Sequence, residues 1–155
     1  MTTPRILVVT DEEKWTRQAM HLACAMARNL DASVALIQLV PVANPYQLGN
    51  IDHPPDFDPD HQAFINELLV TSEDYQTKTE IIRLHYASYI NGISSAAEEL
   101  QALGLFSPPS RYKGHLWERL QSWRLRRAVK CPLFTLDPAD QPGWVQSPKP
   151  ALTRN

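Results

Sequence analysis

Two short, nearly unbroken apolar runs separated by a helical pattern constrain the fold of this chain more than any other feature. They are "RILVVT" at residues 5–10 and "SVALIQLV" at residues 33–40. Runs this short and this rich in aliphatic residues are typical of strands that are covered on both faces. Between them, apolar residues recur at helical spacing on one face: Trp15, Ala19, Leu22, Ala23, Met26, Ala27 and Leu30. The pattern predicts a strand–helix–strand unit whose two strands are parallel.

The remainder of the chain continues this alternation. Its patterns predict helices at residues 61–76, 90–100 and 116–129, and strands at residues 78–87, 103–106 and 132–137. We expect Asp58 or Asp60 to cap the second helix. In the last helix, Leu116, Leu120 and Trp123 are expected to face the core. Five strands alternating with four helices predict an α/β fold, an open, parallel, five-stranded, doubly wound sheet in a Rossmann-like α/β/α sandwich.

Length and composition indicate one domain. The chain has 155 residues, of which 43% are hydrophobic, and this is enough for a single sizeable core. We expect the domain to span residues 1–137 and the proline-rich segment 138–155 to form a mobile tail. Residues 41–61 contain five prolines and four aspartates, so we expect an exposed loop without regular structure there.

Charge and hydropathy argue against two classes of partner. A net charge of -2 gives no general reason to expect nucleic acid. No apolar run approaches the roughly 20 residues of a membrane helix, and the first residues lack the apolar segment of a signal peptide. We therefore expect a cytoplasmic protein with no membrane partner.

The sequence contains no recognisable catalytic or metal-binding pattern. Cys24 and Cys131 lack ligand spacing, and we expect buried free thiols. Carboxylate and imidazole groups gather in the loop but match no known metal cage, so we expect a solvated segment. They are Asp52, His53, Asp56, Asp58, Asp60 and His61. Because nucleophile-elbow and zinc-protease motifs are also missing, no enzyme is predicted.

Two segments of the chain resemble universal stress protein domains. "ILVVTDEEKWTRQAMHLACAMARNLDASVALIQLVPV" is similar to their opening, where a strand leads through a small residue and an aspartate into an alanine-rich helix and a second strand. "LRRAVKCPLFTLD" is similar to their end, where a helix leads through Cys-Pro into the last strand. The resemblance covers residues 5–137 and implies a fold of the adenine nucleotide alpha hydrolase type. A response-regulator receiver domain shares the plan, but its phosphate-accepting aspartate after the third strand and its lysine after the fifth are missing here.

The resemblance also implies a binding site for an adenine nucleotide. In nucleotide-binding members the aspartate after the first strand faces adenine and ribose, and this matches Thr10 and Asp11. Backbone near the end of the second strand touches adenine in those members, which corresponds to Leu39 and Val40. The residues alone also allow Asp11 to serve only as a helix N-cap.

The phosphate-binding motif of the family is not conserved in this sequence. ATP-binding members carry glycine, two residues, glycine, nine residues, glycine, and then serine or threonine. Here Ser107 occupies the place of the first glycine, and Pro108 and Pro109 follow in the turn. Gly114 is out of register, and Ser122 is the nearest candidate for the final residue. Because proline has no N–H and fixes φ, we expect ATP binding of the usual kind to be absent or weak.

Positive charge gathers in the segment 111–130, which has a charge of +6. Its basic residues are Arg111, Lys113, Arg119, Arg124, Arg126, Arg127 and Lys130, against the single acid Glu118. Three interpretations stay open. Arg111 and Lys113 can hold phosphate as side-chain charges; the helix can dock on an acidic protein or nucleic acid; or the charges complement the helix dipole and the solvent.

These observations lead to two functional hypotheses. The first is a universal stress protein-like regulatory domain that acts in the stress response through protein contacts and as a homodimer paired through the last strand, 132–137. It requires no cofactor. The alternative is an adenine-nucleotide-binding module for ATP or AMP that uses Asp11 together with Arg111, Lys113 and Ser122.

Overall fold

The computed structural model describes residues 3–41, 51–52, 59–108 and 115–136. Its strands are β1 (Arg5–Val9), β2 (Ser33–Pro41), β3 (Ile51–Asp52), β4 (Thr79–Tyr86), β5 (Ala102–Phe106) and β6 (Leu133–Phe134). Its helices are α1 (Glu13–Leu30), α2 (Pro59–Asp74), α3 (Tyr89–Glu99) and α4 (His115–Ala128). The strands form one sheet in the order β3-β4-β2-β1-β5-β6.

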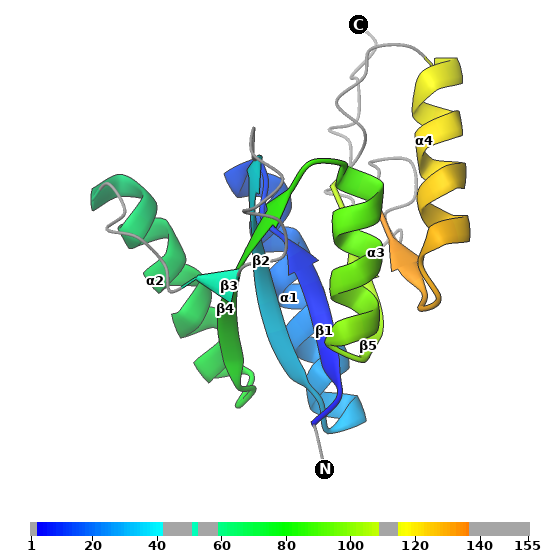
Figure 1. Ribbon diagram of the computed structural model, residues 1–155. Coiled ribbons are helices and arrows are strands. Elements are labelled where there is room, and N and C mark those ends of the chain that lie inside the picture. The colour runs from blue at the N-terminus through cyan, green and yellow to red at the C-terminus, as the bar shows by residue number, and fades with distance from the viewer. Residues whose placement is uncertain (1–2, 42–50, 53–58, 109–114, 137–155) are drawn as a thin grey trace, which may run out of the picture.

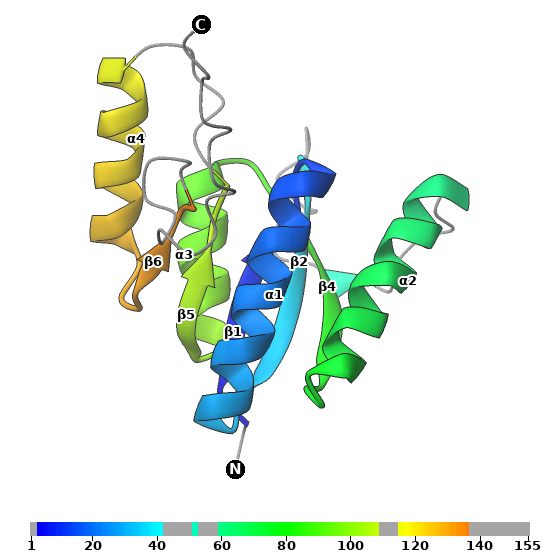
Figure 2. The same cartoon turned by 180° about the vertical axis from the view of Figure 1, so that it is seen from behind.

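Helices cover both faces of the sheet, as the two opposite views show (Figure 1, Figure 2). Successive strand residues point to opposite faces, so each central strand contributes to two cores. Ile6 and Val8 of β1 join the core under α1 and α2, while Leu7 and Val9 join the core under α3 and α4. This confirms the predicted α/β sandwich.

The central helix α1 buries one continuous stripe against the sheet. The buried residues are Trp15, Thr16, Ala19, Met20, Ala23, Cys24 and Ala27. Leu30, predicted to lie on this face, is half exposed, because the helix ends there and Asp31 turns the chain with a φ of 52°. Burial raises the pKa of the Cys24 thiol to about 12 and also raises that of Cys131, which is only partly buried.

Five strands are parallel, as predicted, but the sheet gains a sixth. Ile51 and Asp52 form β3, which pairs antiparallel with the outer edge of β4. The prediction that residues 41–61 contain no regular structure is therefore wrong at these two positions, and also at the ends of the range, where Pro41 belongs to β2 and α2 begins at Pro59. The reason is that β4 has a free edge beyond β2, and a passing segment can pair with it. At the opposite edge β6 covers only Leu133 and Phe134 of the predicted strand 132–137, the last residue of which lies outside the described residues.

The boundaries and faces of two helices also differ from the predictions. Helix α2 begins at Pro59, so Asp60 lies inside its first turn and does not cap it; Asp58 lies outside the described residues. Helix α4 turns Leu116, Leu120 and Trp123 outward, and it is Leu125 and, just past the helix end, Val129 that are buried. None of the helices that the structure describes is long and apolar enough to span a bilayer.

Helix α4 is turned this way because its C-terminal end is attached to α3. Ser94 Oγ donates to the Ala128 carbonyl at 2.9 Å, and Lys130 Nζ lies 3.1 Å from Glu98 Oε1. With this end fixed, the face carrying Leu125 meets the second core.

Candidate functional site

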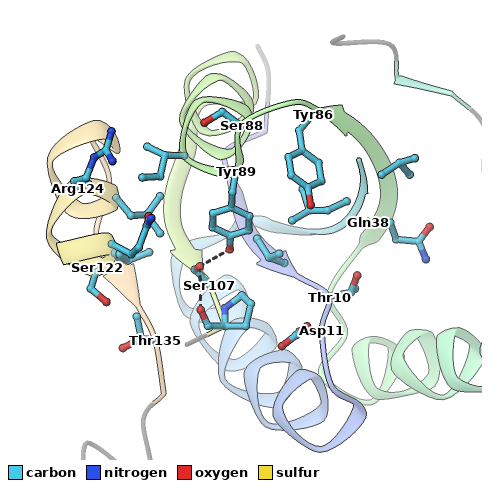
Figure 3. A pocket seen from close by; sticks show the side chains of 18 of the residues that line it. Thr10, Asp11, Gln38, Tyr86, Ser88, Tyr89, Ser107, Ser122, Arg124 and Thr135 are labelled. Carbon is cyan, nitrogen blue, oxygen red and sulfur yellow. Dashed lines mark hydrogen bonds between the residues drawn. The ribbon is translucent and has the colours of Figure 1, made fainter. Parts of the chain in front are cut away.

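A pocket of about 860 Å³ opens at the carboxyl ends of the parallel strands. Its walls come from the ends of β1, β2, β4 and β5, together with α3 and α4 (Figure 3). Strand β1 has β2 on one side and β5 on the other, so the chain leaves the sheet in opposite directions at this point. Open α/β sheets bind ligands in the crevice at such a switch, and the volume is in the range of small-molecule sites.

The end of β1 is held by hydrogen bonds to its neighbours. The backbone N–H and the hydroxyl of Thr10 both donate to the Ile37 carbonyl, at 2.9 and 3.1 Å. The next N–H, from Asp11, donates to the buried Thr16 Oγ1 at 3.0 Å. Glu12 occupies the N-cap position of α1 and makes no side-chain capping bond. The interpretation of Asp11 as the N-cap is therefore wrong, and Asp11 lines the pocket.

The end of β5 is tied to β6 and to α3. The Ser107 N–H donates to the Phe134 carbonyl at 3.0 Å. Ser107 is 1% exposed, and its hydroxyl lies 2.6 Å from the Tyr89 hydroxyl, as the dashed line in Figure 3 shows. The Tyr89 ring meets Tyr86 edge to face, with centroids 6.4 Å apart. Together the two rings give the pocket an aromatic wall.

Polar and charged side chains line the remaining walls. Gln38 Nε2 lies 3.1 Å from His61 Nε2; because an amide nitrogen only donates, this contact needs the unprotonated ring nitrogen of His61. Arg83 from β4 and Arg124 from α4 both line the pocket. The pocket therefore offers cations from two walls and a carboxylate, Asp11, from a third.

The structure brings together the predicted site residues that it describes. Thr10, Asp11, Leu39, Val40, Ser107 and Ser122 all line this pocket. Arg111, Lys113 and Gly114 lie outside the described residues. Sequence reasoning missed Gln38, Arg83, Tyr86, Tyr89 and Arg124. Tyr86 is the last residue of the parallel strand β4 and Tyr89 begins the helix after it, so the carboxyl-end rule applied to every strand would have found them.

The structure describes part of the loop 41–61, in which carboxylate and imidazole groups gather. Within the described ranges, no group of three His, Cys, Asp or Glu side chains could hold a metal ion. Asp60 and His61 belong to α2. His53, Asp56 and Asp58, and the side chain of Asp52, lie outside what the structure describes.

Comparison with known proteins gives one kind of match. No family model and no curated protein matches this chain. Among solved structures, a universal stress protein in complex with cAMP matches at 13% identity with a TM-score of 0.61, covering 88% of this chain and 98% of that one. A universal stress protein from Archaeoglobus fulgidus in complex with dAMP matches at 13% identity with a TM-score of 0.56, covering 87% of this chain and 98% of that one. A universal stress protein family protein from Arabidopsis thaliana with AMP bound matches at 15% identity with a TM-score of 0.51, covering 89% of this chain and 99% of that one. The chain has the fold of the universal stress proteins.

Proposed function

We propose that this chain is a divergent universal stress protein whose pocket binds an adenine nucleoside monophosphate, and that it acts as a regulatory protein rather than as an enzyme. The observation that carries the proposal is the pocket itself. It lies at the switch point between β1 and β5 and joins Asp11, an aromatic wall and two arginines. Structures of the same fold contain cAMP, dAMP and AMP.

The chemistry of the walls suits a purine nucleoside. Val9, Leu39 and Ile90 give apolar surface beside the Tyr86 and Tyr89 rings, and such surface accepts the flat base. The Asp11 carboxylate can accept hydrogen bonds from ribose hydroxyls. Arg124 on α4 can complement one phosphate group as a side-chain charge.

Triphosphate is disfavoured because neither of the two described residues after β5, Ser107 and Pro108, has a backbone N–H to offer. The Ser107 N–H is already used by the Phe134 carbonyl, and Pro108 has no N–H. The first two positions after the strand therefore offer phosphate no amide hydrogen. A chain of three phosphates depends on a nest of such amides, whereas a single phosphate can rely on Arg124 and Ser122, which lie on the same wall of the pocket (Figure 3).

Thermal melting in the presence of AMP, cAMP and ATP tests the proposal. A ligand at 100 times its Kd stabilises the folded state by about 2.7 kcal/mol, so AMP or cAMP should raise the melting temperature clearly and ATP should raise it less. Asp11→Ala should remove most of the rise. Glu73→Ala, at an exposed carboxylate remote from the pocket, should keep it. Equal stabilisation by ATP and AMP would contradict the argument from the β5 turn.

A homodimer paired through the last strand is the second part of the proposal. The feature that supports it is the position of β6 at the end of the sheet, with β5 on one side and no further described strand on the other. An edge strand of this kind can extend the sheet by pairing with a second copy across a two-fold axis.

A further inference from the structure

The outer face of α4 leaves large apolar side chains in solvent. Leu116 is 83% exposed, Leu120 43% and Trp123 54%. Arg127 lies four residues beyond Trp123, and its guanidinium sits over the Trp123 ring at 4.9 Å. We call Leu116, Leu120, Trp123 and Arg127 the α4 seam. Helix α4 lies beside β6 at one edge of the molecule, and its N-terminal end projects past the end of α3 (Figure 1).

The spacing of the seam is that of a coiled coil. Its members follow one another at intervals of four, three and four residues, which is the alternation of d and a positions in a heptad. At 3.6 residues per turn the three apolar side chains fall within an arc of about 60°. A helix that lies in a membrane surface needs a wider apolar face, of about 100° or more. The narrow seam therefore favours one partner helix over a lipid surface.

Arginines flank the seam on both sides. With Leu120 and Arg127 at a positions, Arg119 and Arg126 occupy g positions and Arg124 an e position, and all three are exposed. Residues at e and g select the partner of a coiled coil by charge. A second α4 would place arginine against arginine in either orientation, so self-pairing is disfavoured.

The other helices of the chain do not supply a matching surface. Among the described parts of α1, α2 and α3, the exposed large apolar side chains are Leu30 on α1 and Val70 on α2. One such residue per helix does not make a seam. None of the described helices therefore supplies the occupant, and the arginines that flank the seam point to an acidic helix of another protein.

We propose that the α4 seam docks an amphipathic helix of a partner protein, with apolar a and d positions and glutamate or aspartate at e and g. Trp123, ordered by the Arg127 guanidinium, is the central apolar anchor, in keeping with the enrichment of tryptophan and arginine at interface hot spots. The buried face of α4, through Leu125, holds the helix on the domain. This inference does not depend on nucleotide binding in the pocket.

Two labelled synthetic helices test the proposal by fluorescence anisotropy with the full chain. Both carry leucine at a and d; one has glutamate at every e and g position, and the other has lysine. We expect the glutamate peptide to bind and the lysine peptide not to bind. The double variant Arg119→Glu with Arg126→Glu should weaken the glutamate peptide about tenfold or more and should gain affinity for the lysine peptide. Neither arginine lines the pocket.

Matched controls separate the seam from general charge. Arg28→Glu with Lys78→Glu makes the same change in net charge at exposed positions outside α4 and should leave binding of the glutamate peptide unchanged. Leu116→Ser with Leu120→Ser keeps the arginines and should abolish binding, while melting temperatures report that each variant is folded. The proposal is overturned if both peptides bind equally, if the serine variant still binds, or if phosphatidylserine vesicles bind the chain and the glutamate peptide does not.

Discussion

Gly92 sets how closely α3 approaches the end of β4 beside the pocket. A Cβ atom at this position would lie 2.9 Å from Tyr86 Cβ, and neither atom belongs to a flexible end that could move aside. Gly92→Ala gains helix propensity of about 1 kcal/mol, but overpacking costs about 1–3 kcal/mol. We expect a net loss of stability in urea unfolding and weaker AMP binding, because Tyr86 would shift. Ser95→Ala, at an exposed position of the same helix, is the control, and an unchanged or raised stability of Gly92→Ala would refute the steric argument.

Cys24 makes stability depend on pH above the neutral range. Burial holds its pKa at about 12 in the folded state, whereas an unfolded thiol ionises near pH 8.5. Between these values the unfolded chain loses the proton and the folded chain keeps it, so stability falls as pH rises, by at most about 1.4 kcal/mol per pH unit from this group. Urea unfolding of the wild type and of Cys24→Ala should show the variant less stable at pH 8 and the difference shrinking toward about pH 10.5. If the free energy of unfolding changed with pH in the same way for the wild type and for Cys24→Ala, the thiol would not ionise on unfolding.

Apart from Ser122 on α4, which came from the family motif, the pocket residues that sequence reasoning found lie at strand ends. Thr10 and Asp11 directly follow an apolar run, and Leu39 and Val40 close the next one, so topology alone brings them to one edge of the sheet. The contact between Tyr89 and Ser107 depends on how α3 packs against β4 and β5, which no local pattern encodes. Arg124 reaches the pocket only because α4 turns Leu125 inward.

Helix α4 shows why the face of a helix can be misassigned. Its apolar residues fit two stripes, one through Leu116, Leu120 and Trp123 and another through Leu125 and Val129. Helical periodicity gives the first more support because it has more members. The hydrogen bond from Ser94 to the Ala128 carbonyl favours burial of the second stripe. No local sequence pattern predicts that contact.

Single alanine substitutions distinguish the two faces of α4. Leu125 is 6% exposed and Leu120 43%, so Leu125→Ala should cost about 2–5 kcal/mol through lost burial and a cavity. Leu120→Ala should stay within about 0.5 kcal/mol of the wild type, as surface changes do. Urea unfolding measures both. If Leu120→Ala were the more damaging of the two, the orientation of α4 described here would be wrong.

At the scale of the whole molecule, the sheet topology could be predicted for those strands that are themselves apolar runs in the sequence. The strands β1, β2, β4 and β5 are such runs, and the alternation with helices dictates their parallel order. Strand β3 is different because two residues carry no periodicity, and Ile51–Asp52 becomes a strand only because β4 offers it an edge. The length of β6 likewise depends on its neighbour, because only Leu133 and Phe134 pair with β5.

The outer edge of β6, next to which no further described strand lies, allows a specific test of the dimer. The carbonyls of Pro132 and Phe134 accept from β5, through Leu105 N–H and Ser107 N–H at 3.0 Å each. Because backbone groups alternate along a strand, Leu133 between them turns its own N–H toward the open edge. An antiparallel partner across a two-fold axis would use that N–H.

Leu133→Pro should therefore disrupt a dimer without removing a bond to β5. Proline removes the outward N–H. The control Leu133→Ala also removes most of the leucine side chain but keeps the N–H. In sedimentation velocity over the micromolar range we expect the wild type and Leu133→Ala to form dimers and Leu133→Pro to dissociate about tenfold more readily, a difference of about 1.4 kcal/mol. Melting temperatures of the two variants should be similar, because both lose most of the leucine side chain and neither loses a hydrogen bond to β5. A wild type that stays monomeric, or a proline variant that dimerises as well as the alanine variant, would rule out pairing through β6.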